Sequence, residues 1–520
     1  MASIDKPNIK LPLAPSYNDR GIVIDKTTDQ RKVNCMYEII KNPITGGAKL
    51  YLVKRPGTTE RTQLNFGSSG QTSRLIAPRP GVTASELDQD DMWVFSTSTV
   101  ATTTSQLRVS NSSATTTFLT TSHAASSDFD LAYLSRTLVS QTEFLVVQAV
   151  QFGTPYQQRW FYSSSFAAWS EVNHANFTSV PFRGKAEFMD GYAFGMDSNN
   201  RVWNSSVNAL NAWGSADYRL KEIQQDVAIG LARFNNQLLA FGLETMEPFQ
   251  NAGLATGSPL RRMPHLFQRV GMSMTTLNTY RSNYYAIVGQ NMYFVGNQSM
   301  SRVGFARGVF AYNGSQMNKV SSPAIDKILE ADANVAVWPI TVLGQKGIAI
   351  EFANISLGRF LVYFPEWNDW FEWDTGAFRP VNSGEFFIGI SRPQRIYAFD
   401  ISTNSYLDGR EIDPTTTGVN SSYTMKVQFK MPAEDNNHKQ MRMFGVVGAR
   451  AASSTTSPLS VSVSRDDWQT TTSVGSIDMT SAKKSLYRLG GYEDLGIILE
   501  HSANLDCRLE TAIAHVVERQ

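Results

Sequence analysis

The sequence predicts an all-β protein, in which a β-propeller is joined to a small β-sandwich, or platform, built from N- and C-terminal strands. Aromatic strand cores recur between residues 90 and 410 at steps of about 50 residues, the length of one four-stranded propeller blade. This spacing predicts about seven blades, and six to eight fit it. The cores are Met92–Phe95, Phe144–Val147, Tyr192–Phe194, Leu239–Phe241, Met292–Phe294, Leu361–Tyr363 and Tyr397–Phe399.

The hairpins inside these repeats support the same fold. A strand that alternates large apolar with small or polar residues leads into a turn rich in Asn, Asp, Ser or Gly, and another aromatic or apolar residue follows. Arg307–Tyr312 passes through Asn313-Gly314 to Met317, and Arg359–Tyr363 passes through a polar turn to Trp370. We assign residues 61–418 to the propeller.

The composition agrees with a large β protein. The 520 residues are 42% apolar and only 18% charged, so Ser, Thr, Asn, Gln and Gly must cover much of the surface. Such a surface suits extracellular or particle-bound proteins better than cytosolic enzymes. The net charge of +1 removes any argument from bulk charge for a DNA-coating or membrane-surface protein. Without an apolar signal core or a membrane-length apolar stretch, we expect synthesis and folding in a cytoplasm.

Residues 1–60 form an N-terminal arm of a different texture. Short extended runs alternate with turn residues such as Asn42–Gly47, and Lys54–Gly57 closes the arm. This arm has too little apolar surface to fold alone. We therefore expect it to add strands to another part of this chain or to a neighbouring subunit.

Short helices are expected between some blades. Ser322 before Pro323 is a helix N-cap followed by proline at the first helical position. Apolar spacing at residues 220–227 and a capping-box pattern at 85–88 suggest two more helices.

The last part of the chain, residues 419–520, predicts the β-sandwich or platform domain. Tyr423–Lys430 alternates strictly between apolar and polar residues, and several short strands follow with turns between them. About 100 residues with this pattern are typical of a small sandwich.

Four carboxylates in one predicted hairpin are the strongest candidates for catalysis. Glu366, Asp369, Glu372 and Asp374 could supply the paired acids of a glycosidase. They alternate with tryptophan and phenylalanine, however, so a hairpin with one buried aromatic face explains them without chemistry. We favour this structural interpretation.

The other candidate sites also have plain explanations, and we predict no catalytic residue, cofactor or metal. The histidines share no ligand spacing, and Asp88–Asp91 lacks the Gly and distal Glu of a calcium loop. Cys35 and Cys507 are too few for a disulfide framework or zinc cluster, and we interpret them as reduced, buried thiols. The histidines are His123, His174, His265, His438, His501 and His515.

Two polar motifs remain. Ser464–Trp468 is similar to the turn box of sialidase-type propellers, although it lacks the glycine and occurs once, and that box stabilises a hairpin even where it belongs. Arg261, Arg262 and Arg269 surround a Gly/Pro loop and could contact phosphate. Arginines in such a loop are more often simply solvated.

The ordered motifs of the central region resemble the packaged-DNA stabilisation proteins, or tail nozzles, of short-tailed bacteriophages. The resemblance rests on Phe234–Phe249 and Asn291–Gly296, followed by Arg307–Gly314 and Ser322–Ile325. In that family, a strand ending in Phe-Gly and an acidic-Thr/Ser-hydrophobic-Glu turn precedes an Arg-Gly-Val-aromatic strand and a Ser-capped helix. The segments 29–37 and 54–57 resemble the family's N-terminal arm.

The resemblance implies a non-enzymatic virion protein of the viral tail. It implies a propeller with a platform, assembled as a homohexameric ring under the head-to-tail adaptor, where it retains packaged DNA and conducts it during ejection. The implied partners are the adaptor, tail fibre or tailspike proteins, and double-stranded DNA passing through the lumen without sequence-specific binding. A near-neutral lumen would not trap a sliding polyanion. The alternative is a carbohydrate-active or glycan-binding tail propeller, motivated by the carboxylates at 366–374.

Overall fold

The fold is described from a computed structural model of the chain. The described residues are 3–5, 9–13, 31–41, 48–55, 57–61, 71–78, 92–101, 104–110, 115–122, 129–151, 157–224, 226–254, 257–273, 284–300, 304–331, 335–342, 344–352, 359–374, 378–380, 382–383, 398–400, 409–413, 423–431, 439–449, 456–466, 468–482, 484–492, 495–503 and 505–519.

The chain divides into two compact units, which we call the platform unit and the propeller unit. The platform unit comprises Met1–Thr59, Phe360–Gly376 and Ile412–Gln520. The propeller unit comprises Glu60–Arg359 and Ala377–Glu411. The sequence predicted an arm (1–60), a propeller (61–418) and a C-terminal domain (419–520). This division stays a prediction, and the two compact units are defined separately, from contacts within the structure.

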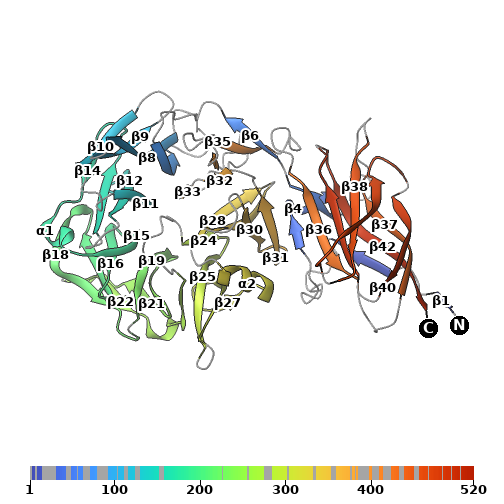
Figure 1. Ribbon diagram of the computed structural model, residues 1–520. Coiled ribbons are helices and arrows are strands. Elements are labelled where there is room, and N and C mark those ends of the chain that lie inside the picture. The colour runs from blue at the N-terminus through green and yellow to red at the C-terminus, as the bar shows by residue number, and fades with distance from the viewer. Residues whose placement is uncertain are drawn as a thin grey trace. The chain divides into compact units, whose positions relative to one another are not determined.

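The propeller unit consists of sheets built mainly from consecutive antiparallel strands, with a parallel pairing of β33 and β7 in the first, and this confirms the predicted all-β propeller (Figure 1). The first sheet has the order β10–β9–β8–β7–β33, with β7 (Gln71–Pro78), β8 (Met92–Ala101), β9 (Thr104–Ser110), β10 (Thr115–Ser122) and β33 (Asn382–Ser383). The second has β11 (Phe129–Val139), β12 (Thr142–Gln151), β13 (Gln157–Ser163) and β14 (Ser170–Glu171) in that order. The third has β15 (Phe182–Met189), β16 (Tyr192–Asp197), β17 (Arg201–Ser206) and β18 (Ala209–Leu220).

The later sheets keep this pattern with one variation. The fourth sheet has β19 (Ala228–Phe234), β20 (Gln237–Gly242), β21 (Met246–Asn251) and β22 (Leu260–Arg262). In the fifth, β23 (Val270–Met272) and β24 (Tyr285–Val288) pair with different parts of β25 (Asn291–Met300), and β26 (Gly304–Tyr312) and β27 (Met317–Lys319) complete it. A hairpin of β28 (Val335–Val342) and β29 (Gln345–Phe352) follows.

Each blade begins with an inner strand. The first strands of neighbouring sheets contact one another, β7 with β11, β11 with β15 and β15 with β19. Figure 1 shows β11, β15 and β19 on the inner side of their sheets, with β18 and β22 farther out. Apolar residues from adjacent sheets pack between the blades, for example Trp160, Phe182 and Trp213, which are all buried. Burial of large aromatic side chains is the main stabilising contribution expected here.

The predicted connecting helix after Ser322 is confirmed as α2 (Pro323–Ala331), with Leu329 buried. The prediction of a helix at 220–227 was wrong, because β18 ends at Leu220, Lys221–Gln224 is non-helical, and β19 starts at Ala228. The segment 85–88 lies outside the described residues. Among the described residues, the other helices are α1 (Ala175–Thr178) and the 3₁₀ turn η3 (Pro264–Leu266). In the described part of the chain, no helix is long and apolar enough to cross a membrane.

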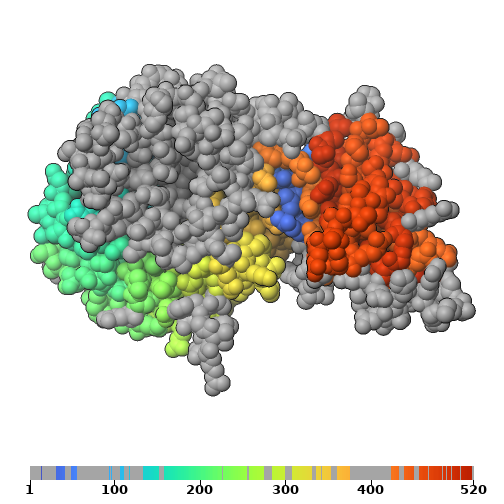
Figure 2. All heavy atoms as spheres, viewed as in Figure 1, coloured from blue at the N-terminus to red at the C-terminus, as the bar shows by residue number. Residues whose placement is uncertain are grey.

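The platform unit is a sandwich of N- and C-terminal strands, as predicted. One sheet has the order β4–β5–β42–β37–β40, and both β1 and β2 pair with β42. Its strands are β1 (Ser3–Asp5), β2 (Ile9–Pro12), β4 (Cys35–Lys41), β5 (Ala48–Lys54), β37 (Lys439–Gly448), β40 (Ser485–Tyr492) and β42 (Arg508–Arg519). The arm therefore adds its strands within this chain. In Figure 2, blue N-terminal residues lie against the orange and red C-terminal strands.

The second platform sheet runs β30–β31–β3–β36–β41–β38–β39. Its strands are β3 (Arg31–Val33), β30 (Arg359–Phe364), β31 (Asp369–Asp374), β36 (Met425–Lys430), β38 (Pro458–Ser464), β39 (Thr472–Asp478) and β41 (Gly496–His501). Two small sheets pair β32 (Phe378–Pro380) with β34 (Ala398–Asp400) and β6 (Gly57–Arg61) with β35 (Gly409–Asp413).

The close approach of two inner strands gives a prediction about stability. Gly184 has φ +67°, and a Cβ atom built there would lie 2.6 Å from Gly230 Cα. Replacing Gly184 with Ala should lower the free energy of unfolding by about 3 kcal/mol, because positive φ and steric overlap both add cost. Gly289→Ala is the matched control: it has φ +61° with open space around it, so about 1 kcal/mol is expected. Urea unfolding measures both, and equal losses would contradict the close-packing argument.

Candidate functional site

The candidate carboxylates lie on the β30–β31 hairpin of the platform unit. Asn368 has φ 49°, which the tight turn between the strands requires. Phe371 and Trp373 are buried, whereas Asp369, Glu372 and Asp374 are only half-buried and Glu366 is exposed. The hairpin thus alternates between a buried aromatic face and a polar face, as the structural interpretation predicted.

Glu372 binds an arginine of the N-terminal arm. The Arg31 guanidinium donates Nε to Glu372 Oε1 and Nη2 to Oε2, both at 2.6 Å. These residues are 341 positions apart in the sequence, and pairing of Val33 with Glu372 brings β3 beside β31. A bidentate guanidinium–carboxylate pair has a strongly directional geometry, so it fixes the arm's register on the hairpin.

Asp369 binds a second cation from the arm. It forms a short ion pair with the Lys32 ammonium group and accepts a hydrogen bond from the Tyr37 hydroxyl at 2.6 Å. Lys32 also donates to the Tyr37 oxygen at 2.7 Å and lies 5.5 Å from the centroid of the Phe371 ring. Burial raises the pKa of Tyr37 well above its usual value, and the Asp369 charge adds to the effect. Tyr37 therefore stays a neutral donor to the carboxylate.

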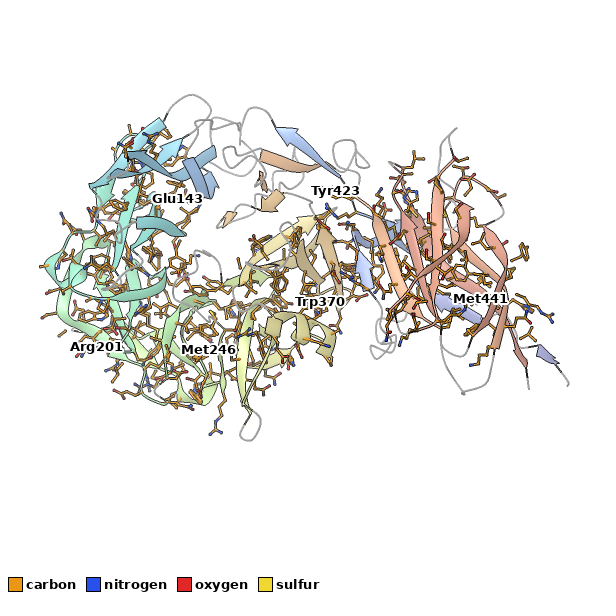
Figure 3. All side chains as sticks on the ribbon, in the orientation of Figure 1. Glu143, Arg201, Met246, Trp370, Tyr423 and Met441 are labelled. Carbon is orange, nitrogen blue, oxygen red and sulfur yellow. The ribbon has the colours of Figure 1, made fainter. Side chains whose placement is uncertain are left out.

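Arg55, at the end of the arm, is the most deeply buried of these cations, with 2% of its surface exposed. Its guanidinium carbon lies 3.7 Å from the Tyr423 ring centroid and 5.2 Å from that of Trp373. It donates to Asn34 Oδ1 at 3.0 Å and to the Asp374 carbonyl at 2.8 Å. Trp370 and Tyr423 are labelled in Figure 3.

Asn34 makes this arrangement possible. It has φ 52°, and its Oδ1 accepts hydrogen bonds from both Arg55 and the Asp374 backbone amide. Its Nδ2 donates to the Thr424 carbonyl at 3.1 Å. One side chain therefore joins the arm to β31 and to the segment before β36. We call Arg31, Lys32, Asn34 and Arg55 with their partners the arm clamp.

The clamp determines what the carboxylates can do chemically. A glycosidase needs two carboxyl groups facing a substrate, one of them held protonated as the acid. Here Asp369 and Glu372 are each neutralised by a cation of the arm. The structure therefore uses them for binding between distant parts of the chain. The sequence showed the carboxylates and the arm separately, but carried no signal that joined them.

The histidines lie apart in the structure. His174 caps α1, His265 lies in η3, His515 lies on β42, and His501 Nε2 is 2.8 Å from Ser457 Oγ in the platform interior. His123 and His438 lie outside the described residues, as does Asp88–Asp91. Among the described residues, no group of three or more His, Cys, Asp or Glu side chains could hold a metal ion. Cys35 and Cys507 are free, buried thiols, as expected.

The Ser464–Trp468 motif stabilises the β38–β39 hairpin of the platform unit. Ser464 Oγ donates to Asp466 Oδ1 at 2.8 Å and accepts from the Trp468 amide at 3.0 Å. The hydroxyl and the amide of Thr470 also donate to the Asp466 carboxylate, and these hydrogen bonds, with that of the Thr470 hydroxyl foremost, lower the pKa of Asp466 to about 2. Trp468 has φ 71° and packs against Gly496, where a Cβ atom would overlap its ring.

The Arg262 guanidinium is held within the propeller. It pairs with the buried Glu247 and with Glu222, and donates to the Leu220 carbonyl at 2.8 Å. These bonds make it a structural residue rather than a solvated one. The structure adds no comparable contact for Arg261.

A neighbouring network explains why residues 221–227 are not helical. Lys221, fully buried, pairs with Asp226 and donates to Thr245 Oγ1 at 2.8 Å. Asp226 Oδ2 accepts hydrogen bonds from the amides of Glu244 and Thr245. Thr245 and Glu247 both belong to the acidic-Thr-hydrophobic-Glu motif. Its polar residues bind the connection between the third and fourth sheets, a role that sequence reasoning missed.

Comparison with known proteins identifies this central region. Residues 145–343 match a phage-stabilisation family model described as "Bacteriophage P22 Gp10, beta-propeller". The predicted resemblance is therefore confirmed for this segment. No curated protein matches the chain.

Two solved structures that match are too distant to carry an argument. One is a glycoside hydrolase, with 9% identity over 74% of this chain and 97% of that chain and a TM-score of 0.24. The other is the N-terminal domain of Nup159, with 8% identity over 72% of this chain and 97% of that chain and a TM-score of 0.34.

Arg55 gives a prediction about the arm clamp. Arg55→Leu should lower the stability of the platform unit by about 3 kcal/mol, because Asn34 Oδ1 loses a buried charged donor and two rings lose their cation. Lys49→Leu is the control, since its ion pair with Glu510 is exposed and should contribute below about 1 kcal/mol. Hydrogen exchange of the amides in 423–431 measures the loss. Equal protection in both variants would contradict a central role for Arg55.

His501 gives a prediction about pH. Burial lowers the pKa of His501 from 6.5 to about 4, nearby Lys54 adds to the shift, and Asp506 opposes it. In the unfolded chain the His501 imidazole becomes protonated below pH 6.5, whereas in the folded chain it stays neutral until the pH reaches about 4. The stabilising contribution is present above pH 6.5 and is lost as the pH falls toward 4, by about 3 kcal/mol.

The measurement compares wild type with His501→Gln, which keeps a polar group facing Ser457. Unfolding free energies are determined by urea titration between pH 7 and 4 under identical salt. The wild-type stability should fall more steeply with acidification than that of the variant. Parallel curves would show that His501 does not titrate differently on unfolding.

Proposed function

We propose that this chain is a subunit of a bacteriophage tail nozzle, which forms a homohexameric ring below the head-to-tail adaptor. In this proposal the ring closes the DNA channel, retains the packaged genome and conducts it during ejection. The match of residues 145–343 to a phage-stabilisation propeller family is the observation that carries the proposal. The protein is then made in the host cytoplasm and resides in the virion tail, where tail fibre or tailspike proteins attach.

The platform unit supports a mechanical role. Its arm is fixed by a bidentate ion pair, a buried guanidinium and a buried lysine, and its strands come from both ends of the chain. A subunit that resists internal pressure benefits from such non-local connections, because no single terminal segment can detach without breaking several of them. The net charge of +1 allows copies to pack without strong mutual repulsion.

A glycan-binding role is the second candidate, and one observation favours it. Trp370 is half-buried and packs on Tyr363 in a tilted arrangement with ring centroids 4.8 Å apart, and the exposed Glu366 lies on the same hairpin. Partly exposed aromatic rings beside a carboxylate can bind a sugar. Asp369 and Glu372 are paired with cations in the arm clamp and so are not available as the two acids of a hydrolase. The second candidate function is therefore glycan binding without hydrolysis.

The experiment measures mass in solution by sedimentation, for the chain alone and mixed with the adaptor of the same phage. The nozzle proposal expects a hexamer, either alone or on the adaptor. Deleting residues 1–40 removes β3 and β4, and should abolish the ring while the propeller stays folded. Deleting residues 1–13 is the milder control, which removes β1 and β2 only. A monomer that ignores the adaptor and cleaves or binds glycans would refute the nozzle.

A further inference from the structure

The inner strand β15 contains a bulge that is unusual in its support. Arg183 pairs with Met196 and Glu187 pairs with Phe194, but the residues between them, Gly184–Ala186, have no partner on β16. A bulge leaves backbone groups without ladder hydrogen bonds and redirects side chains. The backbone groups of this bulge are bound by side chains from outside its sheet, and the bulge carries the side chain of Lys185.

Glutamine side chains of the second sheet bind one side of the bulge. Gln158 Nε2 donates to the Gly184 carbonyl at 3.0 Å, and Gln148 Oε1 accepts from the Ala186 amide at 2.7 Å. Gln148 and Gln158 are buried and hydrogen-bonded to each other at 2.9 Å. Ser135 Oγ donates to the Ala186 carbonyl at 3.0 Å.

Tyr284, next to the fifth sheet, binds the bulge from another side. Its hydroxyl accepts a hydrogen bond from the Lys185 amide at 3.0 Å and donates to the Leu231 carbonyl of the fourth sheet at 2.5 Å. The bulge is therefore held by side chains of the second sheet and by Tyr284, which lies just before β24 of the fifth sheet. These hydrogen bonds hold the backbone at and on both sides of Lys185, and so fix the direction of its side chain.

Lys185 projects from this support with its charge unpaired. The side chain is half-buried, and its ammonium nitrogen lies 5.5 Å from the centroid of the Tyr285 ring. Within the described residues, this ammonium group makes no hydrogen bond and no ion pair. The nearby Glu187 is buried and accepts a hydrogen bond from the Tyr285 hydroxyl at 2.7 Å. Burial raises the pKa of Glu187, with Lys185, the Tyr285 hydrogen bond and Arg233 opposing the rise.

Further cations lie on the same inner strands. Arg183 is half-buried on β15, and Arg233 is exposed on β19 with Nη1 donating to the Phe188 carbonyl. Arg136 on β11 is paired with Glu143 and so adds no free charge. Arg233 and Lys185 both oppose the rise in the pKa of Glu187, so these two cations and one buried carboxyl group lie close together beside the bulge.

We propose that the β15 bulge is a binding site for a small oxyanion of the phosphate or carboxylate class, with Lys185 as its main ligand. Arg233 supplies neighbouring positive charge, since it and Lys185 both act on Glu187. A half-buried ammonium group binds such anions better than an exposed one, because water screens the charge less. The inference does not depend on the nozzle ring, since every residue belongs to one propeller unit.

The test titrates the intact chain with inorganic phosphate and, separately, with citrate, by calorimetry at constant ionic strength against chloride. Wild type should bind at least one of these probes. Lys185→Gln should weaken that binding at least tenfold, whereas Lys185→Arg should keep it within a few-fold. Lys346→Gln, an exposed lysine on β29, is the matched control and should change binding less than twofold.

Each outcome bears on the proposal. A loss confined to Lys185→Gln, with an unchanged melting temperature, supports it. Absence of wild-type binding, or equal weakening in Lys185→Gln and Lys346→Gln, overturns it. Should Lys185→Gln also melt earlier, Arg233→Gln provides the second variant, because it removes a neighbouring charge and the hydrogen bond to Phe188 but leaves the residues of the bulge unchanged. Unchanged affinity in that variant as well would then count against the site. A negative result here leaves the ring measured by sedimentation unaffected.

Discussion

The burial of Arg55 is the constraint on which the platform unit depends. Moving a guanidinium out of water is costly unless oxygens and polarisable groups replace the lost hydration. Asn34, the Asp374 carbonyl and the Tyr423 and Trp373 rings do so here, and they come from the arm, β31 and the segment before β36. None of these groups can take another position without leaving the charge unsolvated. The arm is therefore fixed more by the cost of misplacing Arg55 than by its own small apolar surface.

This constraint affects how the chain can fold. The arm is synthesised first, but its partners on β31 lie more than 300 positions later, with Arg31 and Glu372 separated by 341. The central strand β42 ends at Arg519 and pairs with β1, β2, β5 and β37. For non-local pairings of this kind, the entropic cost of closing a long loop comes before the free energy gained from the contacts. The platform unit should thus complete only after the propeller strands exist, which suits a protein that assembles as a finished particle component.

The sequence predicts the repeats well because a blade repeats its own pattern. Five of the predicted aromatic cores lie on β8, β12, β16, β20 and β25, each next to the inner strand of its sheet. The strand β29 has the aliphatic core Ile348–Ile350 instead. An aromatic pattern therefore misses β29 and matches β30, the next strand. The apolar spacing at 220–227 was misleading, since the ion pair of Lys221 with Asp226 holds that segment in a non-helical form. The arm clamp and the β15 bulge could not be predicted, because their partners are distant in sequence and no local pattern connects them. The last core, Tyr397–Phe399, overlaps the short strand β34, and only its Tyr397 lies outside the described residues.

Several cations in both units are paired with carboxylates, and Lys185 is different. In the platform unit, Arg31 and Lys32 pair with carboxylates, and in the propeller Lys221 and Arg262 do the same, so these cations serve cohesion. Pairing of this kind leaves little field outside the protein, which agrees with the proposed nozzle, where DNA would have to slide rather than bind. Lys185 differs, because side chains of the second sheet and Tyr284 stabilise the backbone that carries it, while its half-buried ammonium group has no carboxylate partner among the described residues. Since an irregular backbone costs stability unless it is supported, this support indicates that the direction of Lys185 matters for something other than folding.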